Sequence, residues 1–325
     1  MRRDRLSGKG RAWRKVLCAA CFAGIGLGAQ AVPPAPTVIR SGTAHEMLFD
    51  LAFDGAIGLA VGAYGAVLAS DDGGLNWRPV GVKQVSVALL GASVKNGRCI
   101  AVGQAGAMLV SDDCRQWRAL PPVSEARLMA VSHNRHQLAV AVGAFGTVLR
   151  SRDGGQHWDV LDLDWSQLNP DGFEPHLYDV HVDDDGLITM VGESGLILRS
   201  VDGETWQILH YGGPSLFGFA AAGSHIFAVG QAGLVLASDD RGRTWRARAT
   251  GMADLLTGVW TNGGGRVVVS GVNVLLESTN EGVDWQPVGP KPQAALVAVS
   301  GATDGAGQNR ILAVGSAATV IELVH

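Results

Sequence analysis

The segment "SRDGGQHW", Ser151 to Trp158, holds the residue types of an active-site loop: a hydroxyl, a carboxylate, an imidazole and two glycines within eight positions. Serine, aspartate and histidine are groups with which enzymes attack substrates and move protons. The same pattern, however, returns as "SDDGGLNW", "SDDCRQW", "SVDGETW", "SDDRGRTW" and "STNEGVDW". A catalytic site is normally built once per domain, so a pattern that occurs six times indicates architecture.

The six copies share a serine, an acceptor side chain two residues later and a closing tryptophan. We expect the acceptor to bond backbone N–H groups inside a turn, glycine to supply a conformation that a Cβ resists, and tryptophan to cover the turn. Copies two and four are one residue shorter, so their turns must differ, whereas the asparagine of copy six keeps an acceptor. The members are Ser70, Asp72, Gly74, Trp77; Ser111, Asp113, Trp117; Ser151, Asp153, Gly155, Trp158; Ser200, Asp202, Trp206; Ser238, Asp240, Gly242, Trp245; Ser278, Asn280, Gly282 and Trp285.

Each copy ends a longer unit, in which a short apolar strand such as "MLFDLAF" precedes a glycine hairpin such as "AVGAYGAVLAS". Successive motif serines are 41, 40, 49, 38 and 40 residues apart. A period of about 40–45 residues with four strands per unit is typical of a β-propeller. We call the strands of one unit A to D, from the innermost outward.

Seven A–B–C sets are present, but only six turns from C to D. The extended segment 37–41 precedes the first strand A, and placing it as the outer strand of the last blade removes two open sheet edges. The sequence therefore predicts an all-β, seven-bladed β-propeller with four-stranded antiparallel blades, closed by its N-terminal strand. The expected blades are 45–80, 86–120, 126–162, 176–210, 215–250, 254–289, and 295–325 with 37–41.

Residues 1–31 have the pattern of a secretory signal: a basic segment, an apolar run too short to span a bilayer, and small residues at Ala29 and Ala31. We expect cleavage after Ala31, a short linker at 32–36, the propeller at 37–325, and a periplasmic location, or the thylakoid lumen in a photosynthetic host. A lipid anchor on Cys21 is the alternative, although Cys18 occupies a position where such a signal has an aliphatic residue.

The remaining chain is acidic. Removing 1–31 leaves 26 − 7 = 19 basic and 30 − 1 = 29 acidic side chains, a net charge near −10. Such a charge argues against nucleic acid and anionic membrane surfaces as partners. We expect no metal site, because the ligand-rich segments "HVDDDG" and "HNRH" occupy turns where such residues are ordinary. We also expect a monomer without a cofactor.

Two cysteines remain in that chain, Cys99 and Cys114, and they fall at the same end of one repeat unit. In an exported protein two thiols often form one disulfide. Buried free cysteines are also common, and a core of this size does not require a bridge. Both alternatives stay open.

The units resemble Asp-box, or BNR, repeats, with the pattern Ser-x-Asp-x-Gly-x-x-Trp. The fuller unit "LFDLAFDGAIGLAVGAYGAVLASDDGGLNW" is similar to the photosystem II stability/assembly factors, and the resemblance covers about residues 37–325. It implies a non-enzymatic scaffold that docks a membrane-protein client, partly through arginines. Arg150 and Arg199, at equivalent positions of neighbouring blades, match such arginines only loosely, and the alternative is solvated arginines paired with aspartates.

In a propeller the D–A loops and B–C turns share one face, whereas the C–D turns lie on the other. The face with the D–A loops carries the long loop 161–178, with Trp165 and Phe173, between blades three and four. A long loop with exposed aromatics is a fair recognition element, although both rings could instead fold back as a lid. The partner-binding candidates are Trp165, Phe173, Glu174, His176, Arg127, Tyr64, Phe145, Arg150 and Arg199.

A glycan-active or glycan-binding propeller is the second hypothesis. Glycosidases need two carboxylates that face each other across a cleft, and Glu174 and Asp254 are the candidate pair. A sialidase is disfavoured, because seven blades are expected rather than six, and Arg40 lies in "VIRS" where that family has an "RIP" segment. Acidic residues on loops are usually solvated, so the sequence favours a scaffold that binds a protein.

Overall fold

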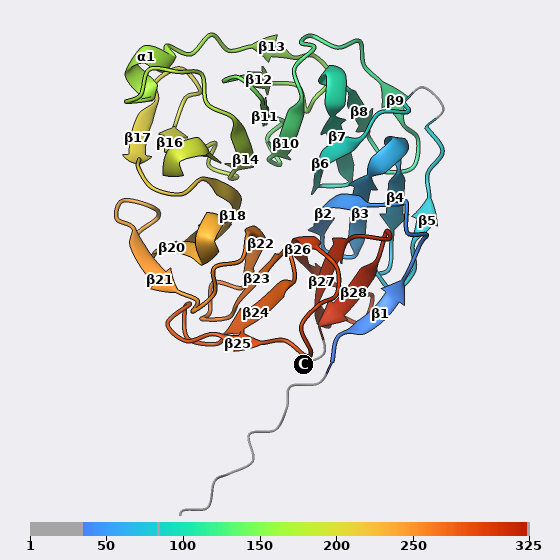
Figure 1. Ribbon diagram of the computed structural model, residues 1–325. Coiled ribbons are helices and arrows are strands. Elements are labelled where there is room, and N and C mark those ends of the chain that lie inside the picture. The colour runs from blue at the N-terminus through green and yellow to red at the C-terminus, as the bar shows by residue number, and fades with distance from the viewer. Residues whose placement is uncertain (1–34, 83–84, 324–325) are drawn as a thin grey trace, which may run out of the picture. The chain divides into compact units, whose positions relative to one another are not determined.

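The strands of the computed structural model form a ring of seven four-stranded antiparallel sheets (Figure 1), and the innermost strand of each sheet lines a central channel. This confirms the predicted seven-bladed propeller. The structure describes residues 35–82 and 85–323, so the signal peptide expected at 1–31 lies outside the described residues. In the described ranges, no helix has the length and apolar character needed to cross a bilayer.

Each blade runs outward from strand A at the channel to strand D at the rim of the ring. Blades one to three are β2 (Leu48–Asp54), β3 (Ile57–Gly62), β4 (Val67–Ser70), β5 (Arg78–Pro79); β6 (Leu89–Lys95), β7 (Arg98–Gly103), β8 (Met108–Ser111), β9 (Arg118–Ala119); β10 (Leu128–His133), β11 (Ala139–Gly143), β12 (Val148–Ser151), β13 (Asp159–Val160). Blades four and five are β14 (Leu177–Val182), β15 (Ile188–Gly192), β16 (Ile197–Ser200), β17 (Gln207–His210); β18 (Leu216–Ala222), β19 (His225–Gly230), β20 (Leu234–Ser238), β21 (Arg246–Ala249). Blades six and seven are β22 (Leu256–Thr261), β23 (Val267–Gly271), β24 (Val274–Ser278), β25 (Gln286–Pro287); β26 (Leu296–Thr303), β27 (Asn309–Gly315), β28 (Val320–Leu323), β1 (Thr37–Arg40). The short helices are η1 (Ala63–Gly65), η2 (Gln104–Gly106), η3 (Glu193–Gly195), η4 (Gln231–Gly233) and α1 (Trp165–Leu168).

The core lies between blades rather than in one centre. The buried apolar side chains form seven clusters, and each cluster combines residues of two neighbouring blades. Strands A to C are therefore covered on both faces, which explains their near-continuous apolar sequences. The motif tryptophans pack into these clusters; Trp77, for example, lies against the cluster between blades seven and one.

A glycine ends strand B in every blade because the backbone of the preceding loop passes too closely for a side chain. A Cβ at Gly143 would lie 2.1 Å from the carbonyl oxygen of Arg127, and one at Gly230 would lie 2.0 Å from that of Ser215. The glycine of the repeated "AVG" is thus required because the end of strand B packs directly against the backbone that enters strand A of the same blade.

The ring closes where the sequence predicted. Strand β1 pairs with β28, with Thr37 opposite Glu322 and Val38 opposite Ile321. The Arg40 guanidinium also donates to the carbonyl oxygen of Ala318 at 3.0 Å. The first described strand and the last therefore share one sheet, and blade seven has no missing strand.

The C–D turns are held by a repeated side-chain network. In copy one, the Ser70 hydroxyl donates to Asp72 at 2.8 Å and accepts the Gly74 N–H at 2.9 Å. The Trp77 indole also donates to the Gly74 carbonyl at 3.1 Å, a bond that the indoles of copies two, five and six do not make. The carboxylate of Asp72 accepts the Asn76 N–H at 3.0 Å. The asparagine of copy six makes the equivalent bond, accepting the Asp284 N–H at 2.9 Å.

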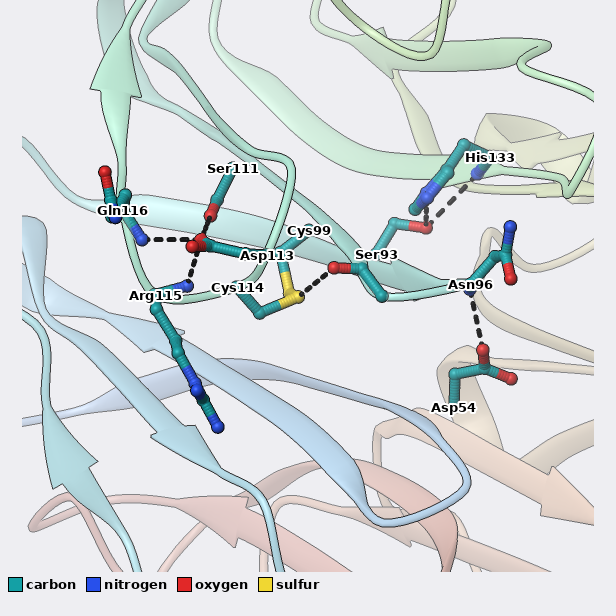
Figure 2. Close-up of a disulfide and its surroundings, with 11 residues drawn as sticks. Asp54, Ser93, Asn96, Cys99, Ser111, Asp113, Cys114, Arg115, Gln116 and His133 are labelled. Atoms are coloured by element: carbon teal, nitrogen blue, oxygen red, sulfur yellow. Dashed lines mark hydrogen bonds between the residues drawn. A yellow bond between two sulfur atoms is a disulfide. The ribbon is translucent and has the colours of Figure 1, made fainter.

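The two shorter turns close differently, as their length requires. Asp113 accepts N–H groups from Arg115 and Gln116, which are two and three residues away instead of four (Figure 2). Asp202 likewise accepts from Glu204 and Thr205, and these N–H groups hold the pKa of that carboxyl below its usual value. The short turns therefore still stabilise a charged aspartate.

Cys99 and Cys114 form a disulfide that joins strand B of blade two to its C–D turn (Figure 2). Cys114 has a φ of 53°, a left-handed conformation that Gly203 adopts in the other short copy. The bridge thus ties down the one short turn that lacks glycine at this position.

Candidate functional site: the aromatic rim of the central channel

The B–C hairpins and D–A loops meet on one face of the ring, as expected from the repeat. The N–H of Gly146 at the blade-three hairpin donates to the carbonyl of Pro175 in the next D–A loop at 2.8 Å. On the other face, C–D turns contact A–B turns, because the Gly73 N–H donates to the Ala56 carbonyl at 2.9 Å. We call the first of these the loop face.

Two exposed aromatic side chains stand at hairpin tips of the loop face. Tyr64 and Phe145 are 75% and 69% exposed, with φ values of 57° and 53°. The equivalent left-handed positions of the other blades hold small or polar residues: Ala105, Ser194, Ala232, Asn273 and Ala317. A bulky side chain in this conformation is uncommon and costs free energy, and such high exposure returns little packing. Folding alone therefore does not account for these two aromatics.

An aromatic row leads from the Phe145 tip into the channel. Phe145 stacks edge-on against His176 with ring centroids 4.8 Å apart, and its N–H donates to the His176 Nδ1 at 3.1 Å. His176 lies 6.3 Å from Tyr178, whose ring lies 4.3 Å from that of Phe217. The row crosses from blade three to blade five.

Tyr178 and Phe217 belong to a collar of seven half-buried side chains at the same position of each strand A. Six of the seven are apolar or aromatic, and the seventh is a threonine. The collar is formed by Phe49, Leu90, Met129, Tyr178, Phe217, Thr257 and Val297, all of which line a channel of about 430 Å³. The hydroxyl of Thr257 has no hydrogen-bond partner among the described residues.

Two carboxyl groups lie one residue deeper, and the sequence interpretation missed both. Asp50 accepts the N–H of Ala92 in the next blade at 2.7 Å, and Asp179 accepts that of Phe219 at 2.8 Å. Burial raises the pKa of Asp50 to about 6; burial, followed by the charge of Asp50, raises the pKa of Asp179 to about 8. The available signal was an aspartate in strand A where the other blades have glycine or alanine.

The two aromatic side chains of the long loop 161–178 have different environments: Trp165 is buried, and Phe173 is exposed. Trp165 begins α1 and is buried in the cluster between blades three and four, close to Gly146. Asn169 fixes the loop by donating to the carbonyl of Phe173 at 2.7 Å, and the Phe173 ring remains 41% exposed. Trp165 therefore folds back as a lid over blades three and four, and its burial removes it from the candidates for direct partner contact. Phe173 stays on the surface.

The remaining loop-face candidates have different environments. Glu174 and Arg127 are exposed, while His176 is half-buried between Phe145 and Tyr178. Asp254 uses its backbone carbonyl to accept the Gly233 N–H at 2.8 Å. The Glu174 side chain is exposed and that of Asp254 is half-buried.

The two arginine candidates lie between blades. Arg150 is buried and donates to the Gly203 carbonyl of blade four at 3.2 Å and to Glu204 at 2.6 Å. Arg199 lies under the blade-five turn, where a Cβ at Gly242 would be 2.5 Å from its guanidinium. Because these guanidinium groups face the neighbouring blade, we count them as parts of the blade interfaces rather than of a docking surface.

The segment that first resembled an active site lies on the opposite face. Asp153 accepts N–H groups of Gln156 and His157 and contacts the His157 ring at 2.6 Å, while Ser151 is buried and bonded to Asp153. These groups stabilise the turn. In the described part of the chain, no group of three or more His, Cys, Asp or Glu side chains is placed to hold a metal ion.

The fold has close structural neighbours. No protein-family model matches the chain, and no curated protein matches its sequence. A solved structure described as YCF48 bound to D1 peptide superposes with a TM-score of 0.70 at 17% identity, covering 91% of this chain and all of that one. YCF48 from Cyanidioschyzon merolae gives 0.70 at 19% identity, covering 89% and 98%.

A glycoside hydrolase is also similar in fold. The GH74 xyloglucanase from Xanthomonas campestris has a TM-score of 0.68 at 14% identity, covering 89% of this chain and 53% of that one. At such identities these likenesses show a shared propeller fold and leave function to the site.

Proposed function

We propose that this protein is an exported, non-enzymatic scaffold whose loop face binds a polypeptide part of a membrane protein complex during its assembly or stabilisation. The observation that carries the proposal is the pair of exposed aromatics, Tyr64 and Phe145, at left-handed hairpin tips of the loop face, with Phe145 joined by an aromatic row to the apolar collar. Exposed aromatics on a rigid frame are typical of protein-binding surfaces.

Two further observations support it. The first 31 residues have the composition of an export signal. One structural neighbour, YCF48, was solved with a D1 peptide bound to it, and all of that structure superposes on this chain. A photosynthetic client is part of the proposal only through that likeness.

Site-specific photo-crosslinking tests the proposal. A photoreactive phenylalanine analogue replaces Phe145 on the loop face, or the equally exposed Val201 on the opposite face as the matched control. In the native cell envelope, the Phe145 position should give a discrete crosslinked product with a membrane-complex subunit, and the Val201 position should not. Equal products from both positions, or none from Phe145, would contradict the proposal.

The second candidate is a glycan-active propeller, favoured by the likeness to a GH74 xyloglucanase and by carboxylates on the loop face. Hydrolysis of a glycan panel, measured for the wild type and for a Glu174→Gln, Asp254→Asn double variant, tests it. Turnover that disappears in the double variant would establish the enzyme; no turnover by the wild type supports the scaffold.

A further inference from the structure

The channel mouth is large enough and open enough to accept part of another molecule. A cavity of roughly 150 Å³ holds a benzene molecule, and the whole channel, which continues past the collar to polar side chains such as Lys95 and His133, measures about 430 Å³. The aromatic row connects its collar continuously with the exposed Phe145 at the surface. A group that contacts Phe145 can therefore extend over the His176 ring toward the collar.

The collar selects for apolar groups. Its side chains offer two hydroxyls in total, those of Tyr178 and Thr257, and otherwise only aliphatic, aromatic and thioether surface. A sugar ring needs several hydrogen bonds to replace those it makes with water, and two hydroxyls do not supply them. The composition favours an aromatic or long aliphatic side chain over a glycan.

The edge of the collar is acidic. Glu193, on η3, accepts the His176 N–H at 2.8 Å and lies against the Tyr178 hydroxyl. Glu193 is therefore the carboxylate that a ligand meets at the edge of the collar, and the chain without residues 1–31 carries a net charge near −10. A cationic neighbour to the apolar group complements this arrangement.

We propose that the collar and rim bind an extended segment of a partner polypeptide, with one aromatic or long aliphatic side chain inside the collar and an adjacent lysine or arginine beside Glu193. This deepens the proposed function and rests on it. Phe145 covers the inserted side chain from outside, and Tyr64 contacts the segment farther along the face. The C–D turn face takes no part in this contact.

Peptide titration tests the proposal. The probe is the capped peptide acetyl-Gly-Ser-Phe-Lys-Ser-Gly-amide, with versions that carry Ala for Phe or Glu for Lys, and binding is followed by ligand-detected NMR. Replacing Phe should weaken binding about tenfold, since it removes one buried ring. Replacing Lys should weaken it about threefold, with the effect shrinking at high salt.

Variants of the protein locate the contact. Thr257→Phe fills the collar without removing a hydrogen bond, and Phe145→Ala removes the rim ring; each should weaken the Phe peptide about tenfold. Glu193→Gln should abolish the preference for Lys over Glu. Val201→Ala, on the opposite face, should change nothing, and thermal unfolding checks that all variants fold.

Three outcomes would overturn the proposal: equal affinity for the Phe and Ala peptides, unchanged affinity in Thr257→Phe, or displacement of the peptide by a xyloglucan oligosaccharide. The crosslinking experiment separates this from the proposed function. If the Phe145 position still crosslinks to a membrane-complex subunit while the collar variants bind normally, the scaffold function stands and the collar is not its binding site.

Discussion

The carboxyl group of Asp179 accepts the backbone N–H of Phe219 at 2.8 Å, so one side chain joins strand A of blade four to strand A of blade five. It also accepts the N–H of Val180 at 2.8 Å. Asp50 makes the same connection from blade one to blade two. Elsewhere in the ring, glycine or alanine at this position lets neighbouring strands approach directly, as at Gly91 beside Ala130.

Asp179 should make the stability of the ring depend on pH. Its folded-state pKa of about 8 lies above its ordinary value of 3.8, so between these values the folded state holds a proton that the unfolded state has released. Stability therefore falls as pH rises from about 4 to about 8, and then levels off. Asp179→Asn cannot titrate, so its unfolding midpoint should fall less across this window in denaturant titrations.

Asp50→Asn provides the matched control. Because the pKa of Asp50 is raised only to about 6, its contribution to the pH dependence should end near that pH. A wild-type midpoint that stays flat from pH 4 to pH 8, or an equal slope in Asp179→Asn, would show that the two carboxyls are ionised in the folded protein.

Arg150 and Arg152 should differ in their effect on stability although both contact Glu204. Arg150 is buried and also bonds the Gly203 carbonyl, whereas the side chain of Arg152 is 65% exposed. Arg150→Met should lower the free energy of unfolding by about 2 kcal/mol, because it leaves a turn carbonyl without a donor. Arg152→Met should change it by less than about 0.5 kcal/mol. Chemical denaturation measures both, and equal losses would contradict the assignment of Arg150 to the blade interface.

The Cys99–Cys114 bridge should stabilise the second blade. The cysteines are 15 residues apart, a loop whose closure contributes about 3 kcal/mol in the chain-entropy account of disulfides. Cys99→Ser with Cys114→Ser should lose about that amount. Cys99→Ser with Cys114→Gly should recover part of it, since glycine adopts the left-handed conformation without strain. Alkylation without reductant checks the bond itself: two labelled thiols in the native protein would disprove it.

Strand β1 should be required for a monomeric ring. A chain that begins at Thr37 keeps the pairing with β28, and one that begins at Gly42 loses it and exposes the edge of blade seven. The shorter chain should lose about 3 kcal/mol, from backbone hydrogen bonds worth about 1 kcal/mol each, and associate at high concentration. Light scattering and denaturation of the two chains measure this difference. A monomeric shorter chain of unchanged stability would contradict it.

The fold could be predicted because its strongest constraints recur within each repeat. Glycines such as Gly143 are imposed by a nearby loop backbone, and tryptophans such as Trp158 by their own turn, whose Gly155 carbonyl accepts the indole N–H. The glycine returns in all seven blades and the tryptophan in six, so both appear directly as periodicity. Counting them predicted seven blades and the closing strand.

The site was harder to predict because its residues act across blades. Asp179 resembles any strand aspartate until Phe219 of the next blade is placed beside it, and Arg150 resembles a surface arginine until the blade-four turn covers it. Trp165 was ambiguous for the same reason, since only the position of Gly146 makes it a lid. The exposed tips Tyr64 and Phe145 were predictable, because local hairpin geometry alone directs them outward.

The seam between β1 and β28 has a consequence for biogenesis. Strand β1 leaves the ribosome before any other strand of the ring, yet its partner β28 is made only after blades one to six. Until then β1 has no strand to pair with, and the blade that is being completed exposes an unpaired edge strand. Contacts of such long sequence separation form slowly and leave time for misassembly, so this protein should depend on chaperones until β28 has been made.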